Sequence, residues 1–521
     1  MNQKRLFMPE IASSNKRIAK NTIFLYARML LLFIVNFYMT RILLQELGVE
    51  DFGLYNVVGG FVAMLGFINT SMTNSIQRFF NFQMGKGSEE GVKQYFESSM
   101  LAQIILAVIV LFFFETIGLW FVNYKMVIPE GRVLAANVVY QSACICAIIG
   151  FIRAPYNALI IAKEKMVFYA YLSIGEALLK VLIIFALSWF TIDKLKLYGV
   201  LLVIVTFFIF LCSVFYCRKI TPAIHFRISR NRKILKEILS FSGWNLIGTA
   251  SGTVKSQGIN IIMNLFFGVA INAARGVAFQ VLSGVQQFVG NFQIAINPQI
   301  IQSYSAGDKM RYFQLTYLSA KISLYMMWIL TLPIILGIDD ILLLWLGDGK
   351  IPEYTNLFVI LILFTGLFDS LGSSLSVSLY ATGNIKVYQI VVSAIKILVL
   401  PISYVLYLWG YAPATSMYVS LVLAGFEQLM RVLIWCKEVD ESPVVYLKHI
   451  ILPGFLIITI SLVALFAISR TITTTNHLVR VIILFCYSMP ISMVLIWFIG
   501  SNKTERNQII SIVKSKIHKK I

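Results

Sequence analysis

Long apolar runs separated by short polar connections dominate the 521-residue chain. A helix rises about 1.5 Å per residue and the hydrocarbon core of a bilayer is about 30 Å thick, so roughly 20 apolar residues can cross it. About fourteen runs reach that length. They predict an all-α integral membrane protein with transmembrane helices at 21–47, 54–83, 94–123, 133–156, 166–191, 197–217, 239–268, 270–304, 312–338, 355–382, 387–409, 411–436, 450–469 and 478–500.

The composition agrees with this pattern and supplies an orientation. Hydrophobic residues make up 58% of the chain and charged residues only 13%, which excludes a soluble enzyme. The 44 Lys+Arg exceed the 24 Asp+Glu and give a net charge of +20. Most of these cations fall at the N-terminus, in alternate connections and in the C-terminal tail, so the positive-inside rule places both termini in the cytoplasm. Nucleic acid is not needed to explain the charge.

The chain repeats itself at an offset of about 220 residues. This offset superposes Gly48 on Gly268 and Gly87 on Gly307. Because six predicted helices separate equivalent points, both copies enter the membrane in the same direction, which predicts two parallel six-helix lobes followed by two C-terminal helices. The expected parts are a basic cytoplasmic N-terminus (1–20), an N-lobe (21–217), an amphipathic basic linker (218–238), a C-lobe (239–436), two further spans (437–500) and a basic cytoplasmic tail (501–521).

Cysteine and histidine predict no metal site. The six cysteines form no CxxC pair and the four histidines have no ligand companions at metal-binding spacing. No phosphate-cradling loop of the Gly-Lys-Ser/Thr type occurs either. We therefore expect no cofactor, and any energy coupling is expected to use a proton or sodium gradient.

Three connections resemble the corresponding hairpins of bacterial polysaccharide transporters. They are LGVEDFGLYNVVGG at 47–60, AKEKMVFY at 162–169 and ATGNIKVY at 381–388. In these stretches, and in its arrangement of six, six and two spans, the chain is similar to O-antigen flippases of the multidrug/oligosaccharidyl-lipid/polysaccharide exporter superfamily. The resemblance implies an alternating-access flippase, not an enzyme. Such a protein moves an undecaprenyl-(pyro)phosphate-linked oligosaccharide from the cytoplasmic to the periplasmic leaflet of the bacterial inner membrane, for surface polysaccharide, O-antigen, lipopolysaccharide or capsule biosynthesis.

Charges inside the predicted spans are the main candidates for function, because an ionisable group at membrane depth is costly. Cations outnumber carboxylates there, which favours an anionic headgroup over a cationic drug. Lys255 stands out because it lies midway along its span in a polar stripe that no lipid-facing helix would tolerate. The predicted pyrophosphate-binding residues are Lys255, Arg28, Arg275, Lys321 and Lys396, and the predicted sugar contacts are Gln257, Asn260, Gln287 and Asn291.

Glu176 and Lys180 are spaced for an ion pair on one helix face. Two interpretations are open: the pair neutralises itself within the membrane, or Glu176 titrates or exchanges partners during transport. The repeat places Glu176 opposite Lys396, so equivalent positions carry opposite charges.

Two other functions fit part of the sequence. A multidrug cation antiporter of the same superfamily would share the architecture, and a membrane-embedded polysaccharide polymerase or glycosyltransferase is the enzymatic alternative. Against the latter, the longest outer connection, around 339–354, is short and apolar. The expected partners are a lipid-linked oligosaccharide, anionic membrane lipids at the basic linker and tail, and a polysaccharide polymerase or other biosynthesis proteins. We expect a monomer.

Overall fold

The computed structural model describes residues 3–124, 126, 128, 131–187, 189–190, 192–222, 224, 231–347, 351–469, 476–502 and 505–506. Every regular element in this part of the chain is a helix, and no strand occurs in it. Most of the predicted basic tail, 507–521, and residues 225–230 of the predicted linker lie outside the described residues.

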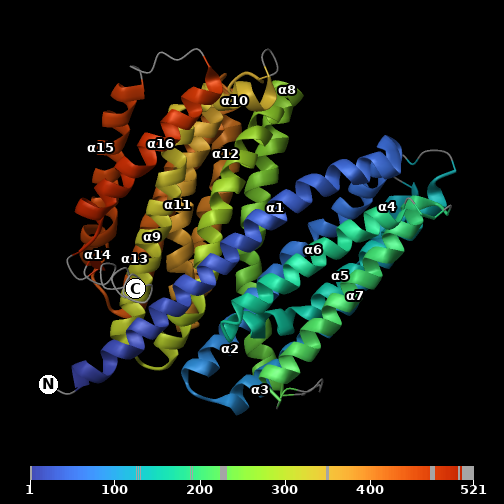
Figure 1. The fold of residues 1–521 in the computed structure, drawn as a ribbon, viewed down its shortest axis with the longest axis horizontal. Helices are drawn as coiled ribbons and strands as arrows, with labels where there is room; N and C mark the ends of the chain where they lie inside the picture. The colour runs from blue at the N-terminus through green and yellow to red at the C-terminus, as the bar shows by residue number, and fades with distance from the viewer. Residues whose placement is uncertain are drawn as a thin grey trace, which may run out of the picture. The chain divides into compact units, whose positions relative to one another are not determined.

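The helices of the first half follow one another through short turns (Figure 1). Their bounds are α1 (Gln3–Met64), α2 (Gly66–Gly85), α3 (Glu89–Phe113), the π-helical turn η1 (Phe114–Gly118), α4 (Leu119–Tyr124), α5 (Val133–Ala162), α6 (Met166–Leu187) and α7 (Lys194–Ile220).

The second half begins with α8, which Asn231 caps by accepting hydrogen bonds from the backbone N–H groups of Lys233 and Ile234. The described end of the predicted linker thus runs into α8 without a break. The bounds are α8 (Arg232–Ser305), α9 (Lys309–Leu336), α10 (Ile338–Leu346), α11 (Thr355–Thr382), α12 (Lys386–Leu408), α13 (Thr415–Val439), α14 (Pro443–Tyr446), η2 (Leu447–Ile451), α15 (Leu452–Ser469), α16 (His477–Leu495) and η3 (Ile496–Gly500).

Ten helical stretches among the described residues are long and apolar enough to cross a membrane. The fourteen predicted spans all fall mainly on helix. The protein is therefore a multi-pass, all-helical membrane protein, while the total of fourteen crossings and the orientation of the termini stay predictions.

Two glycines break the two longest helices at equivalent points of the repeat. Gly48 interrupts α1 with φ 77° and ψ 170°, and Gly268 interrupts α8 with φ 77° and ψ −169°. Only glycine adopts this region without strain. Gly87 and Gly307, the second glycine pair found in the sequence, also share a positive φ, at 68° and 80°. The repeat read from the sequence therefore recurs in the backbone.

The chain divides into two compact units. Unit 1 comprises residues 1–250 and 294–308, and unit 2 comprises residues 251–293 and 309–521. Both ends of α8 thus belong to unit 1 and its middle to unit 2.

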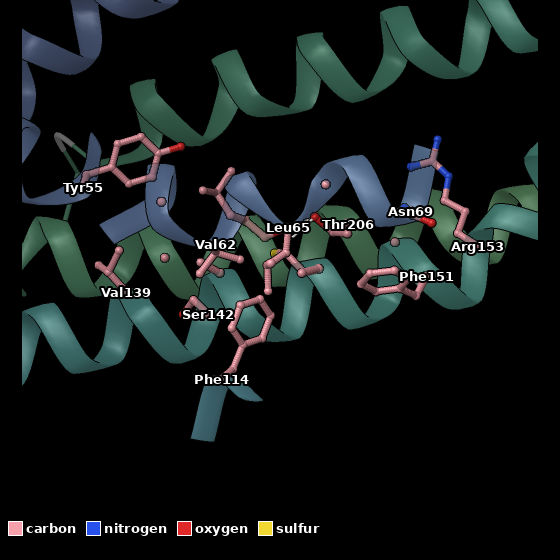
Figure 2. A pocket seen from close by; sticks show the side chains of 18 of the residues that line it. Tyr55, Val62, Leu65, Asn69, Phe114, Val139, Ser142, Phe151, Arg153 and Thr206 are labelled. Carbon is pink, nitrogen blue, oxygen red and sulfur yellow. Dashed lines mark hydrogen bonds between the residues drawn. The ribbon is translucent and has the colours of Figure 1, made fainter. Parts of the chain in front are cut away.

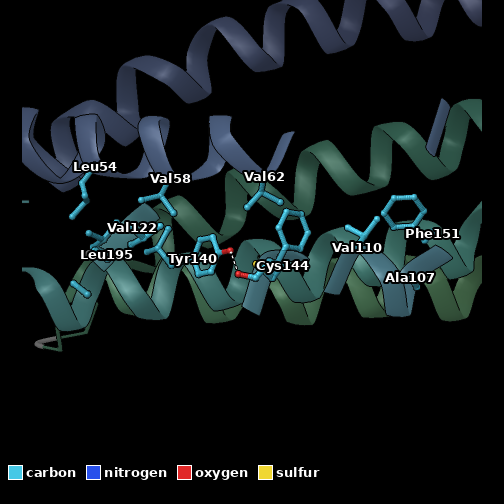
Figure 3. Close-up of a cluster of buried hydrophobic side chains, with 14 residues drawn as sticks. Leu54, Val58, Val62, Ala107, Val110, Val122, Tyr140, Cys144, Phe151 and Leu195 are labelled. Carbon is cyan, nitrogen blue, oxygen red and sulfur yellow. Dashed lines mark hydrogen bonds between the residues drawn. The ribbon is translucent and has the colours of Figure 1, made fainter. Parts of the chain in front are cut away.

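Unit 1 is built around α5, which lies beside α7 (Figure 1) and also contacts α2 and α3. Its apolar core includes Val58 from α1, Val110 from α3 and Phe151 from α5 (Figure 3). Tyr140 is buried in this core and donates a hydrogen bond of 2.7 Å to the carbonyl oxygen of Phe114. Phe114 is the first residue of the π-helical turn η1, where the regular backbone pattern changes.

An ion-pair clamp joins three helices at one end of unit 1. Arg132, just before α5, donates to Asp51 of α1 and, at 2.8 Å, to Asp193, which caps α7. Burial opposes ionisation of Asp193, but the Lys196 backbone N–H and the Arg132 guanidinium outweigh it. The pKa of Asp193 therefore lies below its usual 3.8. The clamp fixes the ends of α1, α5 and α7 relative to one another.

Small hydroxyl residues hold α9 against α11 in unit 2. The Thr316 and Ser378 hydroxyls are 2.8 Å apart, and those of Ser319 and Ser374 are 3.0 Å apart. Such side chains allow close backbone approach and add interhelical hydrogen bonds, as is usual between membrane helices.

Candidate substrate cavities

Lys255 and Ser256 of α8 line a cavity of about 320 Å³ in unit 2. Lys255 lies before the Gly268 break and Arg275 after it, and both line this cavity. Lys396 of α12 and Asp369 of α11 complete its charged lining, so three cations face one carboxylate. The remaining lining residues are Gly252, Ser256, Ile259, Phe279, Leu282, Gln286, Ile362, Thr365, Met417 and Ser420.

Arg275 is the most deeply buried of these cations, at 2% exposed. It donates a hydrogen bond to the side-chain oxygen of Asn260, and its guanidinium lies 4.2 Å from the centre of the Phe279 ring. Its Nε and Nη2 atoms are buried and have no hydrogen-bond partner among the described residues. Because buried donors are costly when unpaired, this guanidinium is set up to receive a further acceptor.

Asn260 is itself held in place. Its side-chain N–H donates 3.1 Å to Gln257, and Asn272 donates 2.9 Å to its backbone carbonyl oxygen. Two predicted sugar contacts, Gln257 and Asn260, therefore orient Arg275, and neither is among the residues that line the cavity.

Among the described residues, neither Lys255 nor Asp369 has a direct partner. Lys255 is half-buried and interacts electrostatically with Asp369, Glu427, Lys396 and Arg275, but it makes no hydrogen bond or ion pair within the described part of the chain. Asp369 exposes its side chain and likewise forms no direct pair there. Both groups thus remain available to a ligand.

Lys396 belongs to a buried network behind the cavity wall. Glu427 of α13 lies 3.7 Å from the Lys396 Nζ and also pairs with Arg431, one helical turn further on. Arg431 donates 3.3 Å to the Ser376 hydroxyl. Sequence reasoning missed Arg431, although its i, i+4 spacing from Glu427 is the signal that identified Glu176 and Lys180.

Four other predicted site residues lie away from this cavity. Lys321, 6% exposed at its side chain, pairs with Glu505 at 3.0 Å. Arg28 lies in unit 1, with its guanidinium 4.7 Å from the centre of the Tyr169 ring. Asn291 donates 2.9 Å to the backbone carbonyl of Gln287. Instead of Gln287, the adjacent Gln286 lines the cavity.

A second cavity, of about 510 Å³, lies inside unit 1 (Figure 2). Arg153 and Asn69 lie toward one end of it, and Tyr55 and Val139 toward the other. Glu176 also lines it and accepts from Arg153 at 3.2 Å and from Lys180 at 2.8 Å. The predicted Glu176–Lys180 pair is therefore one side of a triad in which every charge has a partner.

Comparison with known sequences finds only distant similarity. No family model matches it. An uncharacterized membrane protein EpsK from Bacillus subtilis is 19% identical over 278 residues, which are 52% of this chain and 54% of that protein. The match thus spans about half the length of the curated relative.

Solved structures are more informative about the fold. A multidrug resistance MATE family transporter of the MOP superfamily, in an outward-facing conformation, matches 82% of this chain and 96% of its own with a TM-score of 0.67 and 12% identity. A MATE protein in a straight conformation matches 82% and 97% with a TM-score of 0.69 and 12% identity. The chain has the fold of MATE transporters.

A third solved structure shares this fold. One further match is a MOP superfamily transporter from Pyrococcus furiosus, described as having a binding pocket of reverse polarity that suggests a different function. Its TM-score is 0.67 at 11% identity, over 82% of this chain and 97% of that one. The expectation of this superfamily's fold is thus confirmed, while identities of 11–15% say nothing of the substrate.

Proposed function

We propose that the protein is an alternating-access flippase for an undecaprenyl-(pyro)phosphate-linked oligosaccharide in the bacterial inner membrane. The observation that carries this proposal is the excess of cations in the unit 2 cavity, with two guanidinium donors of Arg275 left without acceptors among the described residues. The sequence resemblance to polysaccharide transporters and the MATE-like fold support a transporter of this kind.

The cavity charge fits a phosphate better than a cationic drug. Three of its four charged lining residues are cations, and including the Glu427–Arg431 pair behind the wall leaves the balance positive. A guanidinium and two ammonium groups suit phosphate oxygens, which accept several charge-assisted hydrogen bonds. In a medium of low dielectric this attraction is stronger than in water.

Headgroup and sugar would meet different parts of the lining. Lys255 and Arg275 are assigned to the phosphate because the Lys255 ammonium makes no direct pair, and two Arg275 donors have no acceptor, among the described residues. Gln286, Thr365 and Ser420 offer amide and hydroxyl groups to sugar hydroxyls within the same cavity. The predicted coupling to a proton or sodium gradient is assigned to Glu176, whose triad lines the unit 1 cavity.

The coupling assignment makes a direct prediction. Glu176→Gln keeps the shape of the side chain but removes the charge that Arg153 and Lys180 share. Transport by this variant is expected to lose its dependence on pH or sodium. Unchanged transport with unchanged ion dependence would leave only a structural role for the triad.

A multidrug cation antiporter is the second candidate, because Asp369 presents a carboxylate without a direct partner among the described residues. The two functions give opposite results in two assays. Complementation of a flippase-null strain, scored by surface polysaccharide, supports the flippase. Drug efflux without complementation supports the antiporter.

Lys255 variants test which group the cavity binds. Lys255→Ala is expected to lose complementation and Lys255→Arg to retain most of it, because Arg preserves the charge. The matched control is Lys93→Ala, which removes a partly exposed lysine outside both cavities. All variants are compared at equal membrane insertion, and full complementation by Lys255→Ala would refute the assignment.

The remaining partners follow from the same proposal. Anionic lipids are expected to contact the basic linker and tail. A polymerase or other biosynthesis proteins would consume the flipped product, and the transporter is proposed to act as a monomer.

A further inference from the structure

Both ends of α8 pack against the first half of the chain, within unit 1. The first segment, 232–250, contacts α2 and α3, and the last segment, 294–308, contacts α2 and the turn between α5 and α6. We call these contacts the α2–α8 seam. The seam includes Gly85 and Ala162, which directly precede Lys86 and Lys163, so it lies at the end that the positive-inside rule assigns to the cytoplasm.

Gly85, the last residue of α2, packs directly against the last turns of α8. A Cβ atom on Gly85 would overlap the Ser305 hydroxyl and the Gln302 carbonyl oxygen, and would lie 2.8 Å from the Gln302 Cα. Rotating the serine would not relieve this overlap, because Gln302 contributes backbone atoms. Any side chain at position 85 therefore requires the helices to separate by roughly 1 Å, given ordinary carbon contacts of about 3.5–4.0 Å.

Gly85 and Ser305 are also equivalent positions of the repeat, 220 residues apart. Two equivalent residues touch each other only near the axis that relates the two copies, as in an isologous interface. In a transporter built from two repeats, the path of the substrate follows that axis. The seam therefore lies where a closed end of the path would lie.

Polar contacts and a ring contact between Phe79 of α2 and Phe241 of α8 hold the seam. Gln302 donates 3.0 Å to the Ala162 carbonyl oxygen and 3.3 Å to the Asn81 side chain. Gln299 donates 3.3 Å to Glu164, a residue that adopts a left-handed φ of 54° although it is not glycine. Such a backbone is strained and persists only where its surroundings hold it.

The other α8 segment makes similar contacts. The Ser71 hydroxyl donates 3.2 Å to the Ser242 carbonyl oxygen, and Asn245 donates 3.0 Å to the Ser71 carbonyl oxygen. Tyr95 of α3 donates 2.6 Å to Glu237. Each is a single hydrogen bond from a polar side chain to a backbone carbonyl or a carboxylate, and water can replace it when the helices part.

The seam also leaves some polar atoms unsatisfied. The Asn81 Nδ2 and the Ser242 Oγ are buried and have no hydrogen-bond partner among the described residues. Opening the seam would let water bind both groups. Their hydration would offset part of the free energy lost when the hydrogen bonds of the seam break. A contact that never opened would be more stable if both groups had hydrogen-bond partners within the protein.

We infer that the α2–α8 seam is a cytoplasmic gate, closed in this structure, and that the absence of a side chain at Gly85 is what allows it to close. This inference rests on the alternating access of the proposed function. To that function it adds the site at which the cytoplasmic end closes, the α2–α8 seam, and the residue whose size decides whether it can close, Gly85. Substrate would enter from the cytoplasm only after α8 moves away from α2 and from the α5–α6 turn.

The test measures access to the seam and needs no substrate. All six native cysteines are replaced, and Asn81→Cys provides one thiol at a position that is 0% exposed. Adding Gly85→Leu is expected to raise the rate of labelling by N-ethylmaleimide about tenfold or more, because a minor open state is ordinarily populated at about 0.1–10%. The matched control, Gly60→Leu, has open space around its Cβ and is expected to leave the rate unchanged.

Slow labelling in the Gly85→Leu chain would overturn the inference. If that variant does not fold, Gly85→Ala is expected to shift the rate in the same direction, and no increase there overturns the inference equally. A second measurement keeps Gly85: oxidising the pair Ser71→Cys/Ser242→Cys is expected to abolish transport and a reductant to restore it. Full transport by the cross-linked chain would contradict the gate. A chain that shows the Gly85 effect but fails flippase complementation retains the gate and loses the proposed substrate.

Discussion

Replacing Arg275 by Met should abolish substrate binding while changing the stability of the fold only slightly. The side chain is 2% exposed, and its Nε and Nη2 are buried without partners among the described residues. Each unsatisfied donor costs about 1–3 kcal/mol, so the change removes a penalty of about 2–6 kcal/mol. It also loses a charged hydrogen bond to Asn260, worth about 1.5–3 kcal/mol, and the Phe279 ring contact, worth about 0.5–2 kcal/mol.

These contributions nearly cancel. The free energy of unfolding should therefore change by no more than about 2 kcal/mol, and Tm by less than about 8 °C. Substrate binding should suffer much more, because the guanidinium is assigned to the phosphate. Farnesyl pyrophosphate serves as a soluble probe of an isoprenoid pyrophosphate. At about 100 times its Kd it stabilises the native state by about 2.7 kcal/mol.

The assay is thermal unfolding of the purified protein with and without farnesyl pyrophosphate, together with complementation. The parent should gain Tm with the probe, and Arg275→Met should not, although its own Tm is close to that of the parent. Arg275→Lys is the control that keeps the charge. A structural guanidinium would behave differently: breaking a buried ionic contact costs about 3–5 kcal/mol. A large fall in Tm with the probe response intact would refute the assignment of Arg275 to the substrate.

Three further changes test the framework around the cavities. Asp193→Asn should lower Tm at neutral pH, because the depressed pKa of Asp193 adds stability above its unfolded value of 3.8. That difference should shrink as pH falls through the folded pKa, and a pH series of Tm measurements checks it. Glu427→Gln leaves Lys396 and Arg431 without their shared carboxylate and should cost about 3–5 kcal/mol of unfolding free energy, seen as a lower Tm. Gly268→Ala, at φ 77°, should cost about 1–3 kcal/mol, whereas Gly60→Ala should not, as measured by the same thermal unfolding.

The sequence could predict the features that depend on local chemistry. Apolar run length predicted the helices. The recurrence of Gly48 at Gly268 and of Gly87 at Gly307 predicted a repeat that the backbone shares between the copies. The spacing of Glu176 and Lys180 predicted their ion pair, found at 2.8 Å. Each of these signals can be recognised along the chain without knowing which helices meet.

Features that depend on which helices meet were beyond the sequence. Lys321 and Lys255 look alike in sequence, as single lysines deep in a span, but Lys321 pairs with Glu505, which lies 184 residues away along the chain. Arg153 completes the Glu176 triad from a different helix. Only packing decides whether a buried charge has a partner, and therefore whether it is available to a ligand.

The two cavities differ in whether their charged lining residues have partners within the protein. In unit 1 all three charges of the Arg153–Glu176–Lys180 triad are paired at 3.2 Å or less, so burial is compensated within the protein. In unit 2, Lys255 has no direct partner among the described residues, and Arg275 keeps two unsatisfied donors. Uncompensated buried charge lowers stability and tends to persist where function requires it. The triad is therefore suited to holding charge that shifts between partners, and the unit 2 cavity to receiving charge from a ligand.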